Sequence, residues 1–540
     1  MTAPTTRWPE ARATRGLVVT PHAFASEAGL AVLKRGGNAV DAAIAAATTV
    51  AVVYPHMNGV GGDSFWLIYD SRRHALRALN AAGRSAAAAD LDTYRARFGS
   101  AIPVRGGAAA LTVPGVVSGW WEAHVLSRDV LDSPIDWHTL LEDAIAHARD
   151  GFPPSPGQRR ETADAADLFG GAAPAEWPAP FWRIYHPARL ARERFVQADL
   201  ATTLEEIARG GAEAFYRGPL AKRIALGAAA AGSPLTGDDL ARHQAEWVDP
   251  LRVPYRGGEA VSCPPPTQGF AALAILSLLE GFDVSALGEA DYVHLVVEAT
   301  KLAFEDRDRY LADPMFSAVP VERCLDPARL AERRRRISRR AAMPAAGAPA
   351  KGDTIAIVTA DAHGNTVCLI QSLYWEFGSG VIAGDTGVLL QNRGAFFSLD
   401  PAHVNRLAPC KQTAHTLIPS MYLVDGRPRL VYGTMGGEGQ PQTQAALATR
   451  IVDRGLGPQA AVEAPRWLFG RTWGEATQSL RLEARFGDEV SQSLRERGHD
   501  VSVVEDWSDL MGHAQIIRLD SDGLSGGSDP RADGAALGVD

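Results

Sequence analysis

Thr354 is the residue whose place in the sequence most directly suggests catalysis. The preceding residues, 333–353, read RRRRISRRAAMPAAGAPAKGD, a basic segment rich in Ala, Pro and Gly that cannot bury enough apolar surface to fold alone. Two apolar runs follow at 355–358 and 367–373, and the turn-forming residues DAHGN between them predict a β-hairpin. Thr354 therefore lies where a flexible segment meets a buried strand.

A threonine at such a junction can become a catalyst if the chain is cut on its N-terminal side. A threonine hydroxyl is a weak nucleophile, but a free α-amine on the same residue, with a pKa of about 7.7 to 8, can act as its general base. Cleavage between Asp353 and Thr354 would leave Asp353 as a new C-terminus and Thr354 as both nucleophile and base. The alternative is an ordinary threonine at the start of a strand, where this residue type is common.

Short motifs are spread over nearly all of residues 16–535. Around Thr354 they are TIAIVTAD followed by GN, then SLYWEFGSG and GVLLQNRG. The others are AGLAVLKRGGNAVDAA (28–43), GVGGDSF (59–65), VPGVVSG (113–119), PPPTQG (264–269), GTMGGEGQPQ (433–442) and SDPRADG (528–534). Together, and in this order, they resemble the γ-glutamyltransferase family.

That resemblance implies the fold and organisation of an N-terminal-nucleophile hydrolase. The expected class is α+β, an αββα sandwich of two stacked, mainly antiparallel sheets flanked by helices. Residues 1–353 would form a large subunit ending in a flexible processing linker at about 333–353, and residues 354–540 a small catalytic subunit. The two would make one interwoven domain, and a dimer of such heterodimers is a further expectation.

Three more residues are candidates for the catalytic machinery. Gly436 and Gly437 precede an expected helix at 442–452, where backbone N–H groups can stabilise an oxyanion. A tight structural turn and a phosphate cradle are the alternatives from the residues alone, and the resemblance favours the oxyanion hole. Ser372 stands where the family has a hydroxyl residue that hydrogen-bonds and orients the nucleophile.

The substrate pocket departs from that of a glutathione-cleaving transferase on its carboxylate side. The family holds the α-carboxylate of glutamate with an arginine and a pair of serines. The matching positions here are Ala82 for the arginine and Pro419-Ser420 for the serines, so only Ser420 keeps a hydroxyl. Arg84, close to Ala82, is a candidate for the mouth of the site by resemblance.

The side of the pocket that would hold the α-amine departs further. Tyr374 stands for an asparagine, Arg393 for a glutamine or glutamate, and Phe396 for an aspartate. An ammonium beside Arg393 would be repelled and would lack its carboxylate partner. A carboxylate suits Arg393 through bidentate, charge-assisted hydrogen bonds, and an arginine in a surface turn is the alternative.

These features are most similar to the oxamate amidohydrolase branch of the family. The sequence therefore predicts a self-processing enzyme that cleaves a small amide bearing a carboxylate and forms an acyl-enzyme on Thr354. Glutaryl-type acylases of the same family are a further possibility, because their substrates also place a carboxylate where Arg393 could bind it. The alternatives are a γ-glutamyltransferase or glutathione hydrolase acting on γ-glutamyl compounds, and an uncut, non-catalytic binding protein.

Composition restricts the partners. The chain has 540 residues, a formal net charge of −9 and a pI near 5.9, which gives no basic footprint for nucleic acid. Its four cysteines are scattered, so neither a disulfide framework nor a zinc site is expected. No long apolar run or export signal is evident, which predicts a cytoplasmic protein without membrane contact. The expected partner is a small-molecule amide, with no metal or organic cofactor.

Periodicity and turn residues place the remaining elements. A strongly apolar helix at 39–53, capped by Asn38, is expected to be buried. Further helices are expected at 21–35, 136–150, 201–227 (punctuated by Gly210-Gly211), 270–279, 291–311 and 442–452, and strands at 65–69, 75–81, 415–422, 429–432, 501–504 and 514–518.

Overall fold

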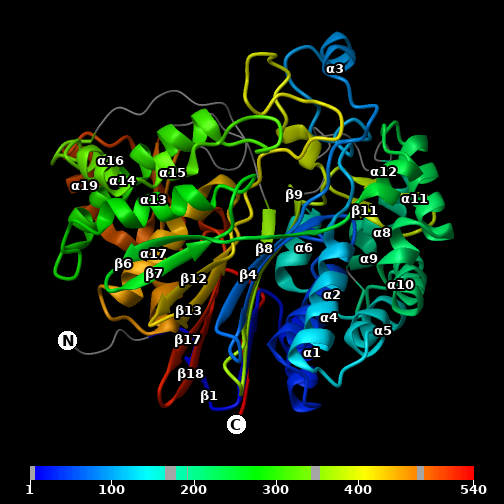
Figure 1. Ribbon diagram of the computed structural model, residues 1–540, viewed down its shortest axis with the longest axis horizontal. Helices are drawn as coiled ribbons and strands as arrows, with labels where there is room; N and C mark the ends of the chain where they lie inside the picture. The colour runs from blue at the N-terminus through cyan, green and yellow to red at the C-terminus, as the bar shows by residue number, and fades with distance from the viewer. Residues whose placement is uncertain (1–5, 164–177, 191, 342–352, 471–478) are drawn as a thin grey trace.

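A computed structural model describes residues 6–163, 178–190, 192–341, 353–470 and 479–540 (Figure 1). Two seven-stranded sheets lie face to face at its centre, with helices on the outer side of each. Within the described ranges, no helix combines the length and apolar character needed to cross a bilayer. The predicted α+β sandwich of two stacked antiparallel sheets is confirmed.

The first sheet contains Thr354. Its strand order is β19-β2-β8-β9-β3-β4-β5, and all neighbouring strands are antiparallel. The predicted hairpin forms its centre as β8 and β9. The bounds are β2 Gly16–Thr20, β3 Asp63–Asp70, β4 Ala75–Ala81, β5 Glu246–Val248, β8 Asp353–Asp361, β9 Thr366–Tyr374 and β19 Ala535–Val539.

The second sheet has the order β1-β18-β17-β13-β12-β7-β6, again antiparallel throughout. Its strands are β1 Ala11–Ala13, β6 Leu251–Tyr255, β7 Gly258–Ser262, β12 Ser420–Val424, β13 Arg427–Thr434, β17 Ala514–Asp520 and β18 Gly523–Ser528. Smaller sheets pair β10 (Val381–Ile382) with β11 (Leu389–Leu390), and join β14 (Trp467–Phe469), β15 (Leu480–Glu483) and β16 (Val501–Val504).

Apolar side chains fill the space between the two large sheets, because alternate residues of each strand point inward. From the first sheet they include Leu17, Phe65, Leu67, Val358 and Ile370, and from the second Val261, Met421, Val431 and Ile517. All of these side chains are buried. Cys368, on β9, belongs to the same cluster.

Helix α2 (Ala39–Val53) packs against β8 and β9 from outside the first sheet, and all of its residues are buried. Asn38 caps it by accepting from the N–H groups of Val40 and Asp41, as predicted. Its burial on all sides explains its nearly continuous apolar sequence. Helices α1 (Ala23–Lys34), α4 (Val116–Leu131), α5 (Glu142–Asp150) and α10 (Ala198–Tyr216, interrupted at Gly211) belong to the same apolar core.

The outer side of the second sheet is covered by α13, α17 and α18, with α14 and α19 beyond them (Figure 1). Their bounds are α13 Gly269–Leu279, α14 Glu289–Tyr310, α17 Gln440–Val452, α18 Pro458–Glu463 and α19 Gly487–Glu496. The other α-helices within the described residues are α3 Leu91–Phe98, α6 Pro156–Ala163, α8 Ala179–Tyr185, α9 Pro187–Leu190, α11 Pro219–Ala230, α12 Gly237–Arg242, α15 Val321–Cys324 and α16 Pro327–Arg334.

Three predicted elements have wrong boundaries. The helix expected at 201–227 is two helices, α10 and α11, separated at residues 217–218. The basic segment was expected to be a flexible linker from residue 333, but Arg333 lies in the last turn of α16, is buried and pairs with Asp306 and Glu305. These carboxylates on α14 hold the start of the segment against the protein, and residues 342–352 lie outside the described ranges. The strand expected at 415–422 begins only at Ser420, because residues 415–419 form an irregular approach to it.

Candidate active site

Thr354 is the second residue of β8, the third strand of the first sheet, and its side chain is buried. The register of β8 against β9 shifts beside it, because Asp353 faces Tyr374 whereas Ile355 faces Gln371. Such a bulge turns a side chain away from its regular direction. Thr354 Oγ1 donates a hydrogen bond to Ser372 Oγ at 3.3 Å.

Ser372 connects Thr354 to the next residue of the site. Its Oγ also accepts from the backbone N–H of Tyr374 at 2.7 Å. Tyr374 has φ = 84°, a left-handed conformation that is costly for a bulky residue and that is enriched at active sites. The Tyr374 ring lies 4.0 Å from Cζ of Arg393, so its face covers the guanidinium.

Arg393 is a buried cation whose hydrogen-bonding capacity is only partly used. It lies in a short 3-10 helix (Arg393–Phe396) and is 1% exposed. Its Nη1 donates to Thr416 Oγ1 at 3.3 Å, whereas Nε and Nη2 have no acceptor among the described residues. Burial lowers its pKa to about 10, opposed by Tyr374, Asp63 and Glu438, so it stays protonated at neutral pH.

Asp63 and His415 complete the surroundings of Arg393, and the sequence analysis did not single them out. Asp63 lies opposite Ser372 in the β3–β9 register. Its Oδ1 accepts from the N–H groups of Gly83 (2.9 Å) and Gly115 (3.2 Å), and its Oδ2 lies 3.2 Å from His415 Nε2. The Asp63 and His415 side chains are buried, as are all three of these contacts of the Asp63 carboxylate.

The pKa values of this pair reflect its burial. Burial raises the pKa of Asp63 to about 7, against the opposing effects of the Gly83 N–H and the charge of Arg393. Burial, assisted by Arg393, lowers the pKa of His415 well below its ordinary value. His415 is therefore neutral near pH 7 and can donate from Nε2 to Asp63. The motif GVGGDSF contained the available signal, an acid between a Gly-rich turn and a buried strand.

The Gly436-Gly437 pair offers two backbone donors. Both residues have positive φ, 131° and 51°, and they lead through a 3-10 turn (Gly437–Gly439) into α17. Within the described part of the chain, neither of their N–H groups donates to a protein acceptor. Two adjacent, uncommitted N–H groups before a helix are suited to an anion or a developing oxyanion.

Two candidate substrate residues have other partners. Ser420 Oγ donates to Gln444 Oε1 at 2.6 Å, and the hydroxyl beside Arg393 belongs to Thr416 instead. Arg84 pairs with Asp313 at 3.1 Å and Glu246 at 3.3 Å. The structure thus links Thr354, Ser372, Tyr374 and Arg393 through two hydrogen bonds and a cation–π contact, and it gives Ser420 and Arg84 contacts outside that group.

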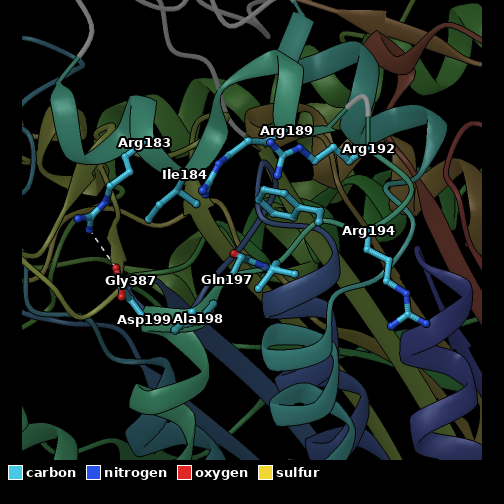
Figure 2. A pocket seen from close by; sticks show the side chains of 12 residues that line it. Arg183, Ile184, Arg189, Arg192, Arg194, Gln197, Ala198, Asp199 and Gly387 are labelled. Atoms are coloured by element: carbon cyan, nitrogen blue, oxygen red, sulfur yellow. Dashed lines mark hydrogen bonds and ion pairs between the residues drawn. The ribbon is translucent and has the colours of Figure 1, made fainter.

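Two other places in the fold could hold a ligand. A pocket of about 330 Å³ is lined by residues of α8, α9 and α10 and by the segment between α9 and α10. Arg183 and Arg189 are among them (Figure 2), and none of the candidate site residues lines this pocket. His294, Glu298 and His499 place three metal-ligand atoms within 4.8 Å of one another. Lys301 Nζ, 2.7 Å from Glu298, already neutralises that carboxylate, which makes this a poor site for a divalent cation.

Known proteins resemble this chain over its whole length. A family model described as Gamma-glutamyltranspeptidase matches residues 25–539. The glutathione hydrolase-like YwrD proenzyme of Bacillus subtilis (strain 168) is 47% identical over 529 residues, 97% of this chain and 99% of that protein. The oxamate amidohydrolase proenzyme of Klebsiella pneumoniae is 45% identical over 527 residues, 97% and 98% of the two chains. The crystal structure of a cephalosporin acylase from Bacillus halodurans gives a TM-score of 0.90 at 36% identity, covering 100% of this chain and 98% of that one.

Proposed function

Because the chain belongs to the gamma-glutamyltranspeptidase family of enzymes, we propose that it is a self-processing amidohydrolase whose substrate is a small amide bearing a carboxylate, such as oxamate. The observation that carries the substrate class is the buried Arg393, whose Nε and Nη2 have no acceptor in the described part of the chain. A buried donor left unsatisfied costs about 1 to 3 kcal/mol, so an incoming carboxylate gains from pairing with both.

Processing would begin with attack of Thr354 Oγ1 on the carbonyl carbon of Asp353. The C–N bond breaks, the threonine nitrogen takes up the proton, and an ester joins the two segments. Water then opens the ester, giving Asp353 a carboxylate and Thr354 a free amine. The proposed products are a large fragment, 1–353, and a small fragment, 354–540, which remain together.

Turnover would use the same hydroxyl. The free amine of Thr354 accepts the hydroxyl proton as Oγ1 attacks the amide carbon of the substrate. The N–H groups of Gly436 and Gly437 stabilise the resulting oxyanion, and Ser372 holds Oγ1 in position. The amine returns the proton to the leaving nitrogen, which departs as ammonia, and water releases the acyl group as a carboxylate.

A γ-glutamyl substrate is the second candidate, since relatives of this chain carry the name glutathione hydrolase. Its α-ammonium would meet Arg393 in a buried site. Two like charges 4 Å apart repel by about 4 kcal/mol at an effective dielectric of 20. Arg393 therefore favours the carboxylate-only substrate over the γ-glutamyl one.

Comparison of substrates tests this proposal. We expect purified protein to release ammonia from oxamate, or p-nitroaniline from glutaryl-p-nitroanilide, faster than it releases p-nitroaniline from γ-glutamyl-p-nitroanilide. Denaturing electrophoresis of the same sample should give two bands, and Edman degradation should find one chain starting at Thr354. Rapid turnover of the γ-glutamyl compound alone would overturn the substrate class, and one intact, inactive band would favour a binding protein.

Asp63 should make substrate affinity depend on pH. Its pKa of about 7 means that it gains a negative charge as the pH rises through neutrality. The ionised carboxylate would compensate Arg393 and repel the substrate carboxylate, so we expect KM to rise roughly 10-fold between about pH 6 and about pH 8, a change of about 1.4 kcal/mol. An Asp63→Asn variant should show a flat KM over this range.

The matched control for this prediction is Asp41→Asn. Asp41 is another buried acid whose pKa burial raises, but its partners are Ser127, Ser133 and Asn38 on the helical side of the first sheet. Its KM profile should follow the unmodified protein. If KM still rises with pH in Asp63→Asn as it does in the unmodified protein, Asp63 has no part in substrate binding.

Asp63 should also affect stability. The folded state holds the Asp63 proton more tightly than the unfolded state, so this residue lowers the free energy of unfolding as pH rises from about 4 to about 7.

A further inference from the structure

Gln268 is a buried amide that contacts both halves of the candidate active site. It precedes α13 and is 1% exposed. Its Nε2 donates to the carbonyl of Gly437 at 3.0 Å and to the carbonyl of Thr416 at 3.1 Å. Gly437 belongs to the candidate oxyanion hole, and the Thr416 hydroxyl contacts Arg393. One NH₂ group therefore joins the two segments on which the proposed reaction depends.

The backbone of Gln268 strengthens this connection. Its N–H donates to the carbonyl of His415 at 3.0 Å, and the N–H of His415 donates to the carbonyl of Pro266 at 2.7 Å. Residues 266–268 are thus joined to the irregular segment that carries His415 and Thr416. This matters because that segment lies outside the regular ladder of β12, so its position depends on such contacts.

Arg307 fixes the orientation of the Gln268 amide. Its Nη1, on α14, lies 3.4 Å from Gln268 Oε1 and 3.1 Å from the carbonyl of Glu438. An arginine can only donate, so the oxygen of Gln268 must face it and the NH₂ must face the two carbonyls. The Gly439 N–H donates to the carbonyl of Gly436 at 2.9 Å. Three successive carbonyls, 436 to 438, therefore accept hydrogen bonds. They lie on the same loop as the N–H groups of Gly436 and Gly437, which have no acceptor among the residues that the structure describes.

We propose that Gln268, oriented by Arg307, is a positioning residue. It fixes the position of the oxyanion-hole loop, which carries Gly436 and Gly437, relative to the carboxylate receptor, which is Arg393 with Thr416. This inference rests on the proposed function of the same site. Glutamine suits the role because it supplies two N–H donors and one acceptor in a single plane. A glutamate would keep the acceptor for Arg307 and would present a carboxylate oxygen to two carbonyl oxygens, which repel it.

The test compares Gln268→Glu with Gln442→Glu. Gln442 is equally buried, and it too donates to a backbone carbonyl, that of Phe469, and accepts from the same residue's N–H. We expect Gln268→Glu to lower kcat at least 10-fold and to raise KM for a carboxylate-bearing amide several-fold. Gln442→Glu should lower thermal stability with kcat and KM close to those of the unmodified enzyme.

An inhibitor pair distinguishes positioning from general loosening. A carboxylate-bearing boronic acid forms a tetrahedral adduct with a threonine hydroxyl, whereas the corresponding unreactive carboxylate occupies only the receptor around Arg393. In Gln268→Glu the boronic acid should lose at least 10-fold more affinity than the unreactive carboxylate, because only the adduct uses the Gly436 and Gly437 donors.

The outcomes separate this inference from the function on which it rests. If Gln268→Glu and Gln442→Glu change kcat, KM and the inhibitor ratio equally, Gln268 is merely structural and the inference is overturned. If the unmodified protein turns over no carboxylate-bearing amide, the proposed function fails first. Should Gln268→Glu fail to fold, Gln268→Met, which removes the donors without adding charge, must show the same fall in kcat, and normal turnover in it contradicts the inference.

Discussion

Replacement of Thr354 by alanine is expected to give a single uncut chain with no measurable amidase activity. The variant lacks the oxygen that would attack both the Asp353 carbonyl and the substrate, so we expect turnover to fall by at least about 10⁴-fold. Electrophoresis should show one band in place of fragments 1–353 and 354–540. Mass spectrometry after incubation with substrate should find no acyl adduct.

Two further variants distinguish loss of the Thr354 hydroxyl from loss of folding. Thr354→Ser keeps a hydroxyl and an amine and should retain both processing and partial turnover. Thr359→Ala, in the same strand, removes another buried hydroxyl, one that donates to the carbonyl of Ala39 at 2.7 Å, and should process normally. Full activity in Thr354→Ala would remove Thr354 from the mechanism.

Arg393→Met should raise KM for a carboxylate-bearing amide by about 30-fold to more than 1,000-fold. Losing one partner of a buried, hydrogen-bonded charge pair costs about 2 to 5 kcal/mol, and methionine fills part of the volume without a charge. Steady-state kinetics with oxamate or a glutaryl amide provides the measurement. A neutral analogue, with an amide or ester in place of the carboxylate, should lose far less.

Arg450→Met is the matched control. Arg450 is also buried, and burial lowers its pKa. Its guanidinium lies 5.5 Å from the Trp467 ring and donates to the backbone carbonyl of Pro465, so its contacts differ from those of Arg393. This variant should lose stability while keeping its KM. If Arg393→Met binds the carboxylate substrate as well as the unmodified enzyme does, the proposed receptor is wrong.

Local patterns predicted much of the framework. The hairpin around Thr354 and the buried helix α2 followed from apolar periodicity, turn residues and a capping asparagine, all of which act within a few residues. The pairing of Thr354 with Ser372 was expected from the family resemblance, and the hairpin brings the two hydroxyls within 3.3 Å of each other.

The surroundings of Arg393 could not be predicted from local sequence patterns. Leu417 and Ile418 gave the segment before Ser420 the appearance of a strand. The resemblance pointed to Ser420 as the hydroxyl of the receptor, whereas the hydroxyl that contacts Arg393 is that of Thr416. Asp63 and His415 are 352 positions apart in sequence, so only the stacking of the two sheets reveals their contact. Burial, which raises the pKa of Asp63, is likewise a property of the assembled core.

The strand order has a consequence for the chain if it is cut as proposed. Strand β2 lies between β19 and β8, and β18 lies between β1 and β17, so each large sheet contains strands from both sides of the Asp353–Thr354 bond. Once that bond is broken, neither product can leave unless hydrogen-bonded ladders open in both sheets. Separation of the two polypeptides is therefore the same event as global unfolding, and recovery from it becomes a bimolecular encounter that the uncut chain never has to make.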